Sequence, residues 1–112
     1  MNINISKVKI FVAIPTKSVD DVRKEIFKTK AGVIGNYTCC TSSVKCVGTF
    51  KPNENSNPYI GEKNKIEYVD EEKLEFVCNV EDVREVLKTI RQVHPYEEPA
   101  IDIVPLIDEN SF

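Results

Sequence analysis

Apolar and polar residues alternate most regularly at the start of the chain. In residues 7–14 every second position is apolar, at Val8, Ile10, Val12 and Ile14, and Pro15 follows. A period of two is typical of a β-strand with one buried face, so this pattern predicts a strand over residues 7–14. The opposite face changes from lysine to Phe11 and Ala13, which indicates that this face is also covered in its second half.

A helical pattern follows the first strand. Apolar residues recur at the spacing of one helix face, at Val19, Val22 and Ile26. Ser18 is the expected N-cap, with Asp21 completing a variant of the capping box. Gly32 is the expected stop. The sequence therefore predicts a helix that begins at Ser18 and ends near Gly32.

The middle of the chain has the composition of strands. Residues 37–51 are rich in Thr, Val, Cys and Tyr, and a bend or small hairpin is expected at residues 41–43. A loop of turn formers spans residues 53–58. The apolar Tyr59 and Ile60 beyond it are expected to dock on this chain or on a neighbouring subunit. Residues 65–78 alternate again, with an exposed bend or bulge expected at residues 70–73.

The last third repeats the order of the first. Asn79 is the expected N-cap of a second helix, which Pro95 ends. Its apolar positions are Val80, Val83, Leu87 and Ile90, with Val86 beside them. Residues 100–106 form the last expected strand, and the polar tail at 108–111 is expected to fray.

The two helix starts also resemble each other in sequence, since Val-Asp-Asp-Val-Arg at 19–23 reappears as Val-Glu-Asp-Val-Arg at 80–84. The chain thus reads as two similar β-α-β halves in one domain, residues 1–112. This order predicts an α+β, ferredoxin-like β-α-β-β-α-β sandwich, a four-stranded antiparallel sheet with two helices on one face. Five apolar residues cannot all be assigned to the helix face: Phe11, Ala13, Val77, Ile101 and Ile103. An apolar second face predicts a homo-oligomer.

Composition narrows the function classes. The net charge is −3, with acidic and basic residues interspersed, so no basic stripe for nucleic acid is expected. No apolar run approaches a membrane span, and residues 1–7 lack the pattern of a signal peptide, so we expect a cytoplasmic protein. The four cysteines contain no Cys-x-x-Cys pair and are expected to be reduced, small apolar residues.

Residues 94–100, His-Pro-Tyr-Glu-Glu-Pro-Ala, hold the only histidine. Two prolines make this segment stiff and extended. One interpretation is a helix stop that leads rigidly into a strand, and the other is a binding or subunit-contact surface. Glu97 and Glu98 diverge in an extended segment, so they make no acid/base pair by themselves. His94 with Glu97 or Glu98 is the candidate divalent-metal site, shared between subunits if further ligands are needed.

Three motifs carry a family resemblance: Gly-Thr-Phe-Lys-Pro at 48–52, Asn-Pro-Tyr-Ile-Gly at 57–61 and the segment 94–100. The last resembles the motif of CutA proteins, trimeric relatives of the PII signalling fold. All three, in this order, resemble the inserted domain of the Nif-three-like proteins, also called GTP cyclohydrolase I type 2-like, and the likeness runs from Lys7 to Pro105. The chain looks like a stand-alone version of that insert.

The resemblance implies a PII/CutA-like fold and a trimer. The family's dinuclear-metal core lies outside the insert, so its hydrolase activity does not transfer, and no catalytic residue is assigned. The expected ligand or subunit-contact residues are Gly48, Thr49, Phe50, Tyr59, Gly61, His94, Tyr96, Glu97 and Glu98.

Two functional hypotheses remain beside each other. The first is a non-enzymatic trimeric binding or regulatory module that requires no cofactor. The alternative is a copper- or zinc-binding protein, or an accessory subunit of a separate Nif-three-like core protein.

Overall fold

The computed structural model describes residues 4–112. The N-terminal segment considered for a signal peptide begins in residues 1–3, which lie outside the described part. The strands are β1 (Lys7–Pro15), β2 (Ser42–Phe50), β3 (Glu67–Asn79) and β4 (Ile101–Leu106), and the helices are α1 (Val19–Phe27) and α2 (Val83–Val93). A short 3₁₀ turn precedes each helix, η1 (Thr16–Ser18) before α1 and η2 (Val80–Asp82) before α2. A third, η3 (Glu109–Ser111), follows β4.

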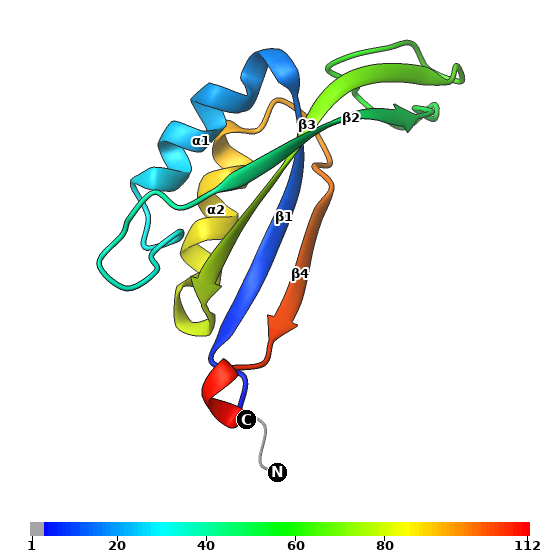
Figure 1. The fold of residues 1–112 in the computed structure, drawn as a ribbon. Coiled ribbons are helices and arrows are strands. Elements are labelled where there is room, and N and C mark those ends of the chain that lie inside the picture. Colours follow the sequence, from blue (N-terminus) through cyan, green and yellow to red (C-terminus); the bar gives the residue numbers. More distant parts are fainter. Residues whose placement is uncertain (1–3) are drawn as a thin grey trace.

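The four strands form one antiparallel sheet in the order β2-β3-β1-β4. Both helices lie on the same side of this sheet and pack against each other (Figure 1). The predicted ferredoxin-like β-α-β-β-α-β arrangement is confirmed.

The core lies between the sheet and the helices. The alternating residues of β1 pair across the sheet with like residues of β3, as Val8 with Cys78, Ile10 with Phe76 and Val12 with Leu74. All six are buried, and Val19, Val22, Ile26, Val86 and Ile90 close the core from the helices. One buried face on each of β1, β3, α1 and α2 is what the sequence periodicity requires.

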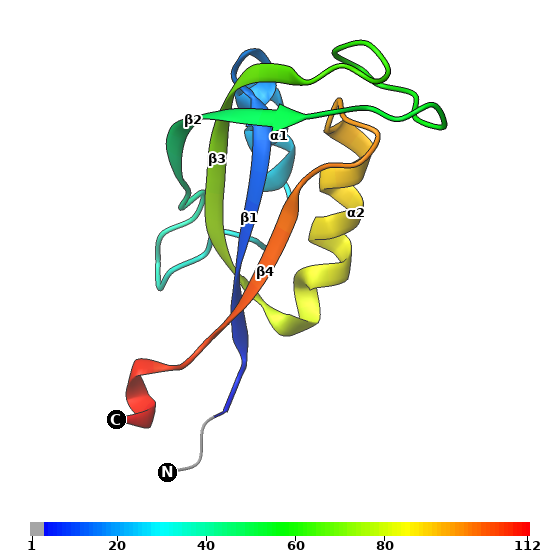
Figure 2. The ribbon, with the colours of Figure 1, turned by 90° about the vertical axis from the view of Figure 1, so that its right-hand side faces the viewer.

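The second sheet face carries no helix (Figure 2). The strand register places Phe11, Ala13 and Val77 on this open face, whereas Ile101 and Ile103 lie opposite Val12 and Ile10 on the helix side. The open face carries both apolar and charged side chains. On it, Lys9 Nζ lies 3.6 Å from Glu75 Oε1 in an ion pair. The open face is thus the side of the sheet that carries no helix and includes Phe11, Ala13 and Val77.

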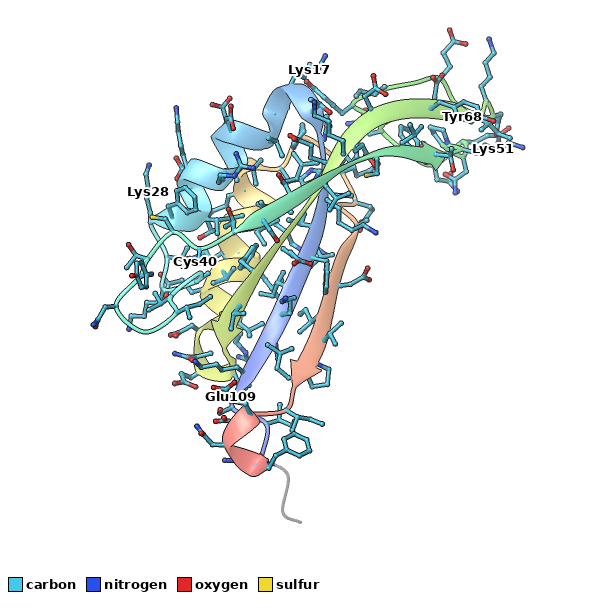
Figure 3. All side chains as sticks on the ribbon, viewed as in Figure 1. Lys17, Lys28, Cys40, Lys51, Tyr68 and Glu109 are labelled. Atoms are coloured by element: carbon cyan, nitrogen blue, oxygen red, sulfur yellow. The ribbon has the colours of Figure 1, made fainter. Side chains whose placement is uncertain are left out.

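Strands β2 and β3 extend beyond the helices as an arm (Figure 1). The molecule measures 49 × 29 × 23 Å along its principal axes. Lys51 and Tyr68 lie at the far end of this arm (Figure 3). The loop of residues 51–66 joins the two strands there. The arm presents Val47 and Tyr68 to solvent, because no helix reaches that part of the sheet.

Two strand predictions were wrong. No bend interrupts residues 70–73, because β3 continues from Glu67 to Asn79, and the charged residues there pair across the sheet with β1 and β2. Residues 37–41 are not strand, apart from a single bridge between Ile34 and Tyr37. Cys39 has a positive φ of 58°, so Cys39 and Cys40 are not alternating strand residues.

The helix ends also differ from prediction. Neither Ser18 nor Asn79 makes a side-chain capping hydrogen bond, because a 3₁₀ turn accompanies each helix start. Helix α1 ends at Phe27, well before Gly32. The φ of Gly32 is +73°, a left-handed conformation that suits glycine, and its carbonyl accepts from Cys40 N at 2.8 Å. Gly32 therefore turns the loop after the helix.

All four cysteines have free thiols, and only Cys78 is fully buried. Burial is the main cause that raises the pKa of Cys78 to about 11, and the acidic residues of η2 and α2 add to it. That thiol stays protonated at neutral pH and packs as an apolar residue. Within residues 4–112, none of the helices has both the length and the hydropathy of a membrane span.

Truncation of Ile90 tests the core. Ile90 is fully buried on α2, so Ile90→Ala should lower the free energy of unfolding by about 2–5 kcal/mol in urea titrations. Lys88→Ala, two residues away and exposed, is the matched control and should change it by less than about 0.5 kcal/mol. Equal effects of the two variants would contradict the described helix face.

Candidate functional site

The three motifs that carry the family resemblance meet at one pocket. It lies where the arm leaves the body of the sheet and has a volume of about 370 Å³. Of the predicted residues, Gly48, Thr49, Phe50, Tyr59, Tyr96, Glu97 and Glu98 line it. Ala13 of β1 and Glu71 of β3 complete its inner wall. Segments far apart in sequence thus share one cavity.

His94 lies behind the pocket, with 6% of its surface exposed. Its Nε2 is 2.7 Å from the carbonyl oxygen of Ala13, and its Nδ1 accepts from the backbone N–H of Tyr96 at 3.0 Å. Because a carbonyl only accepts and an amide N–H only donates, the ring must be the neutral tautomer with the proton on Nε2. The imidazole therefore ties the loop after α2 to the central strand β1.

Burial lowers the pKa of His94 below its usual value, although the Ala13 carbonyl and the charge of Glu71 act in the opposite direction. The neutral ring is thus the form that the folded protein favours. Protonation would place a hydrogen on Nδ1, against the Tyr96 N–H, and remove that hydrogen bond.

Tyr96 and Glu71 form the inner wall of the pocket. The Tyr96 hydroxyl donates to Glu71 Oε2 at 2.7 Å. Burial and this hydrogen bond both raise the pKa of Tyr96, so the hydroxyl stays a donor at physiological pH. Glu71 itself is 6% exposed.

Gly48 makes room for that carboxylate. A Cβ built on Gly48 would overlap the Glu71 side chain, so any larger residue there would displace it. Gly61 acts similarly at the base of the arm loop, where its φ is +91° and the Glu67 side chain lies over it. Gly61 is not part of the pocket lining. The two motif glycines therefore seat two glutamates of β3.

Aromatic rings gather around Tyr96. The Phe50 ring meets it edge-to-face with centroids 5.8 Å apart, and the Tyr59 ring lies at 6.4 Å. Tyr59 thus docks on its own chain, one of the two expected outcomes. Glu97 Oε2 accepts from the backbone N–H of Asn57 at 2.8 Å, which joins the 94–100 segment to the arm loop.

Two residues of the inner wall were missed from sequence. Glu71 was assigned to an exposed bend, and Ala13 was considered only as an apolar strand residue. The signal for Glu71 was the period-two pattern itself, which continues through residues 67–78 if charged side chains are accepted on the open face.

The candidate metal residues do not gather into one cluster. His94 has both ring nitrogens engaged within the chain and is absent from the pocket lining, whereas Glu97 and Glu98 line the outer part. Among residues 4–112 no group of three His, Cys, Asp or Glu side chains is placed to hold a metal ion.

Substitution of the histidine tests its buried neutral state. The histidine of the unfolded chain binds a proton at a higher pH than buried His94 does. The free energy of unfolding should therefore decrease as the pH falls below 6.5, the usual pKa of histidine. His94→Gln keeps an N–H for Ala13 and removes the titration. It should be less stable than wild type by about 1–3 kcal/mol at pH 7.5, and the gap should narrow at pH 5. A gap that widens in acid would show a raised pKa instead.

The chain is similar to known proteins over about nine tenths of its length. No family model matches the chain. The GTP cyclohydrolase 1 type 2 homologue of Halalkalibacterium halodurans is 42% identical over 101 residues, covering 90% of this chain and 27% of that protein. The homologue of Listeria monocytogenes is 40% identical over 99 residues, covering 88% and 26%. The chain therefore spans about a quarter of the curated relatives it matches.

The same similarity is found among solved structures. A Bacillus cereus protein related to NIF3 has a TM-score of 0.79 and 34% identity, covering 95% of this chain and 27% of that one. CutA1 from Shewanella sp. SIB1 has a TM-score of 0.69 at 16% identity, covering 94% and 85%, which shows a shared fold alone. Nearly the whole chain is thus a PII/CutA-like domain similar to one segment of the NIF3-related GTP cyclohydrolase 1 type 2 homologues.

Proposed function

We propose that this chain is a cytoplasmic, non-enzymatic and trimeric binding or regulatory module, with its ligand site in the pocket of the three motifs. The observation that carries the proposal is the convergence of residues 48–52, 57–61 and 94–100 on one 370 Å³ cavity. Ligand sites are typically concave, mostly apolar and furnished with a few convergent polar groups. This pocket combines aromatic and proline side chains with three carboxylates.

The chemistry of the site favours binding over catalysis. The one histidine is held behind the pocket wall by two hydrogen bonds, so it is not poised to exchange protons with a ligand. The Tyr96 hydroxyl is committed to Glu71, and burial keeps the pKa of that tyrosine high. These side chains shape and polarise the cavity.

The open face supports the proposed trimer. Phe11, Val77 and Val104 lie on it, and Val104 is 44% exposed. A hollow of about 290 Å³ over Phe11 and Ala13 leaves room for side chains of another copy. Burial of such a face is the usual reason for association, and the resemblance to CutA implies three subunits.

The relatives suggest a further partner. Because the chain corresponds to about a quarter of each relative, the rest of those proteins offers a surface that this chain would meet as a separate subunit. An accessory role beside a NIF3-related core protein is therefore part of the proposal.

Sedimentation velocity at micromolar concentration tests the trimer. The 12.7 kDa chain should sediment as a trimer, and Val104→Asp should dissociate it by placing a charge on the open face. Val80→Asp is the matched control, since Val80 is 46% exposed outside that face, and it should leave the mass unchanged. A wild-type monomer would overturn the trimer.

Divalent-cation binding is the second candidate function. Its support is the carboxylates of the pocket and the name of a fold neighbour, the periplasmic divalent cation tolerance protein CutA from Archaeoglobus fulgidus, at 16% identity. The engaged nitrogens of His94 weigh against the site of His94, Glu97 and Glu98 predicted from sequence, because a metal would have to displace one of their partners.

Titration with copper and zinc decides between the two candidates. By the first proposal, calorimetry should give the same weak binding for wild type and for His94→Ala, with Lys88→Ala as the surface control. Loss of a tight site in His94→Ala alone would establish the metal function in its place.

A further inference from the structure

Glu71 is a buried carboxylate with an incomplete set of partners. Residue 71 on β3 pairs with Cys46 of β2 and Pro15 of β1, and its carboxylate lies against Gly48 in the lining of the pocket. The Tyr96 hydroxyl is its hydrogen-bond donor. Within residues 4–112 no ion pair includes Glu71.

A carboxylate in this position is costly. A charge that leaves water without a charged partner loses solvation that a single neutral donor does not restore. The chain nonetheless keeps both a glycine at 48, which makes room for the carboxylate, and a tyrosine at 96 that orients it. The side chain is thus positioned, and residues 4–112 supply no ion-pair partner for it.

The rest of the pocket is suited to a cation with an apolar body. The rings of Phe50, Tyr59 and Tyr96 lie beside one another, and aromatic faces attract cations. Glu97 and Glu98 on the outer lining outnumber Lys51, so the opening has a negative balance. The carboxylates do not approach one another as metal ligands do in the described part of the chain.

We infer that the pocket binds a small organic cation, a protonated amine on a short apolar chain, whose N–H donates to the free oxygen of Glu71 while its carbons lie among the three rings. A cavity of about 370 Å³ is at the small end of ligand pockets, which fits a molecule of this size. The inference rests on the proposed binding function and names its ligand class. The same ammonium chemistry is available from a free amine or from a lysine side chain of a second copy.

A charge series of probes tests this inference. Pentylamine, 1-pentanol and pentanoate share one chain and differ in charge. In calorimetry at pH 7.5, pentylamine should bind at least about tenfold more tightly than 1-pentanol, since a charge-assisted hydrogen bond is stronger than a neutral one. Pentanoate should not bind. Glu71→Gln should abolish the preference for the amine. Glu85→Gln, an exposed change on α2, should retain it.

The outcomes separate the inference from the proposed function. Three results would each contradict binding of a small organic cation: equal binding of amine and alcohol, an unchanged preference in Glu71→Gln, or no binding of any probe to the folded protein. The mass of the trimer remains a separate test of the proposed binding module. Amide NMR spectra of Glu71→Gln exclude unfolding as the cause, and Tyr96→Phe, which frees the carboxylate, should retain a preference for the amine. Sedimentation with excess pentylamine identifies the source: an intact trimer indicates a free amine, and dissociation indicates a lysine from another copy.

Discussion

The hydrogen bond between His94 Nε2 and the Ala13 carbonyl is the contact on which the site depends. It fixes the end of α2 against the central strand β1 at 2.7 Å. The second ring nitrogen then accepts from Tyr96 N, so one imidazole determines both where the loop begins and how the next residues run. The prolines at 95 and 99 limit the remaining freedom of the segment, and the tyrosine ring is thereby aimed at Glu71.

The other contacts around the pocket depend on the position that His94 gives to the 94–100 segment. Tyr96 orients Glu71, Gly48 leaves the space that the carboxylate occupies, and Glu97 holds the arm loop through Asn57. The three motifs are therefore one structure, in which each segment supplies a part that the others need. The histidine shapes this structure from behind the cavity, which explains why a residue type common in active sites does not line the pocket.

Much of the fold could be predicted from sequence because periodicity reports burial. The alternation at Val8, Ile10 and Val12 and the helical spacing of Val19, Val22 and Ile26 place one face of each element in the core. Local signals failed where tertiary contacts decide: the charged residues 70–73 looked like a bend, although cross-strand pairing keeps them extended. The site was harder still, because the partners of His94 lie 81 residues away at Ala13 and within a turn at Tyr96, and no pattern in one sequence reports such a pairing.

The most direct test of this account is the tautomer of the only histidine. Nitrogen NMR of the imidazole at pH 7.5 should show a protonated Nε2 and an unprotonated Nδ1, and the ring should stay neutral to a lower pH than an ordinary histidine, as the lowered pKa requires. A ring protonated on Nδ1, or one that titrates at the ordinary pKa, would contradict the claim that His94 is the structural clamp behind the pocket.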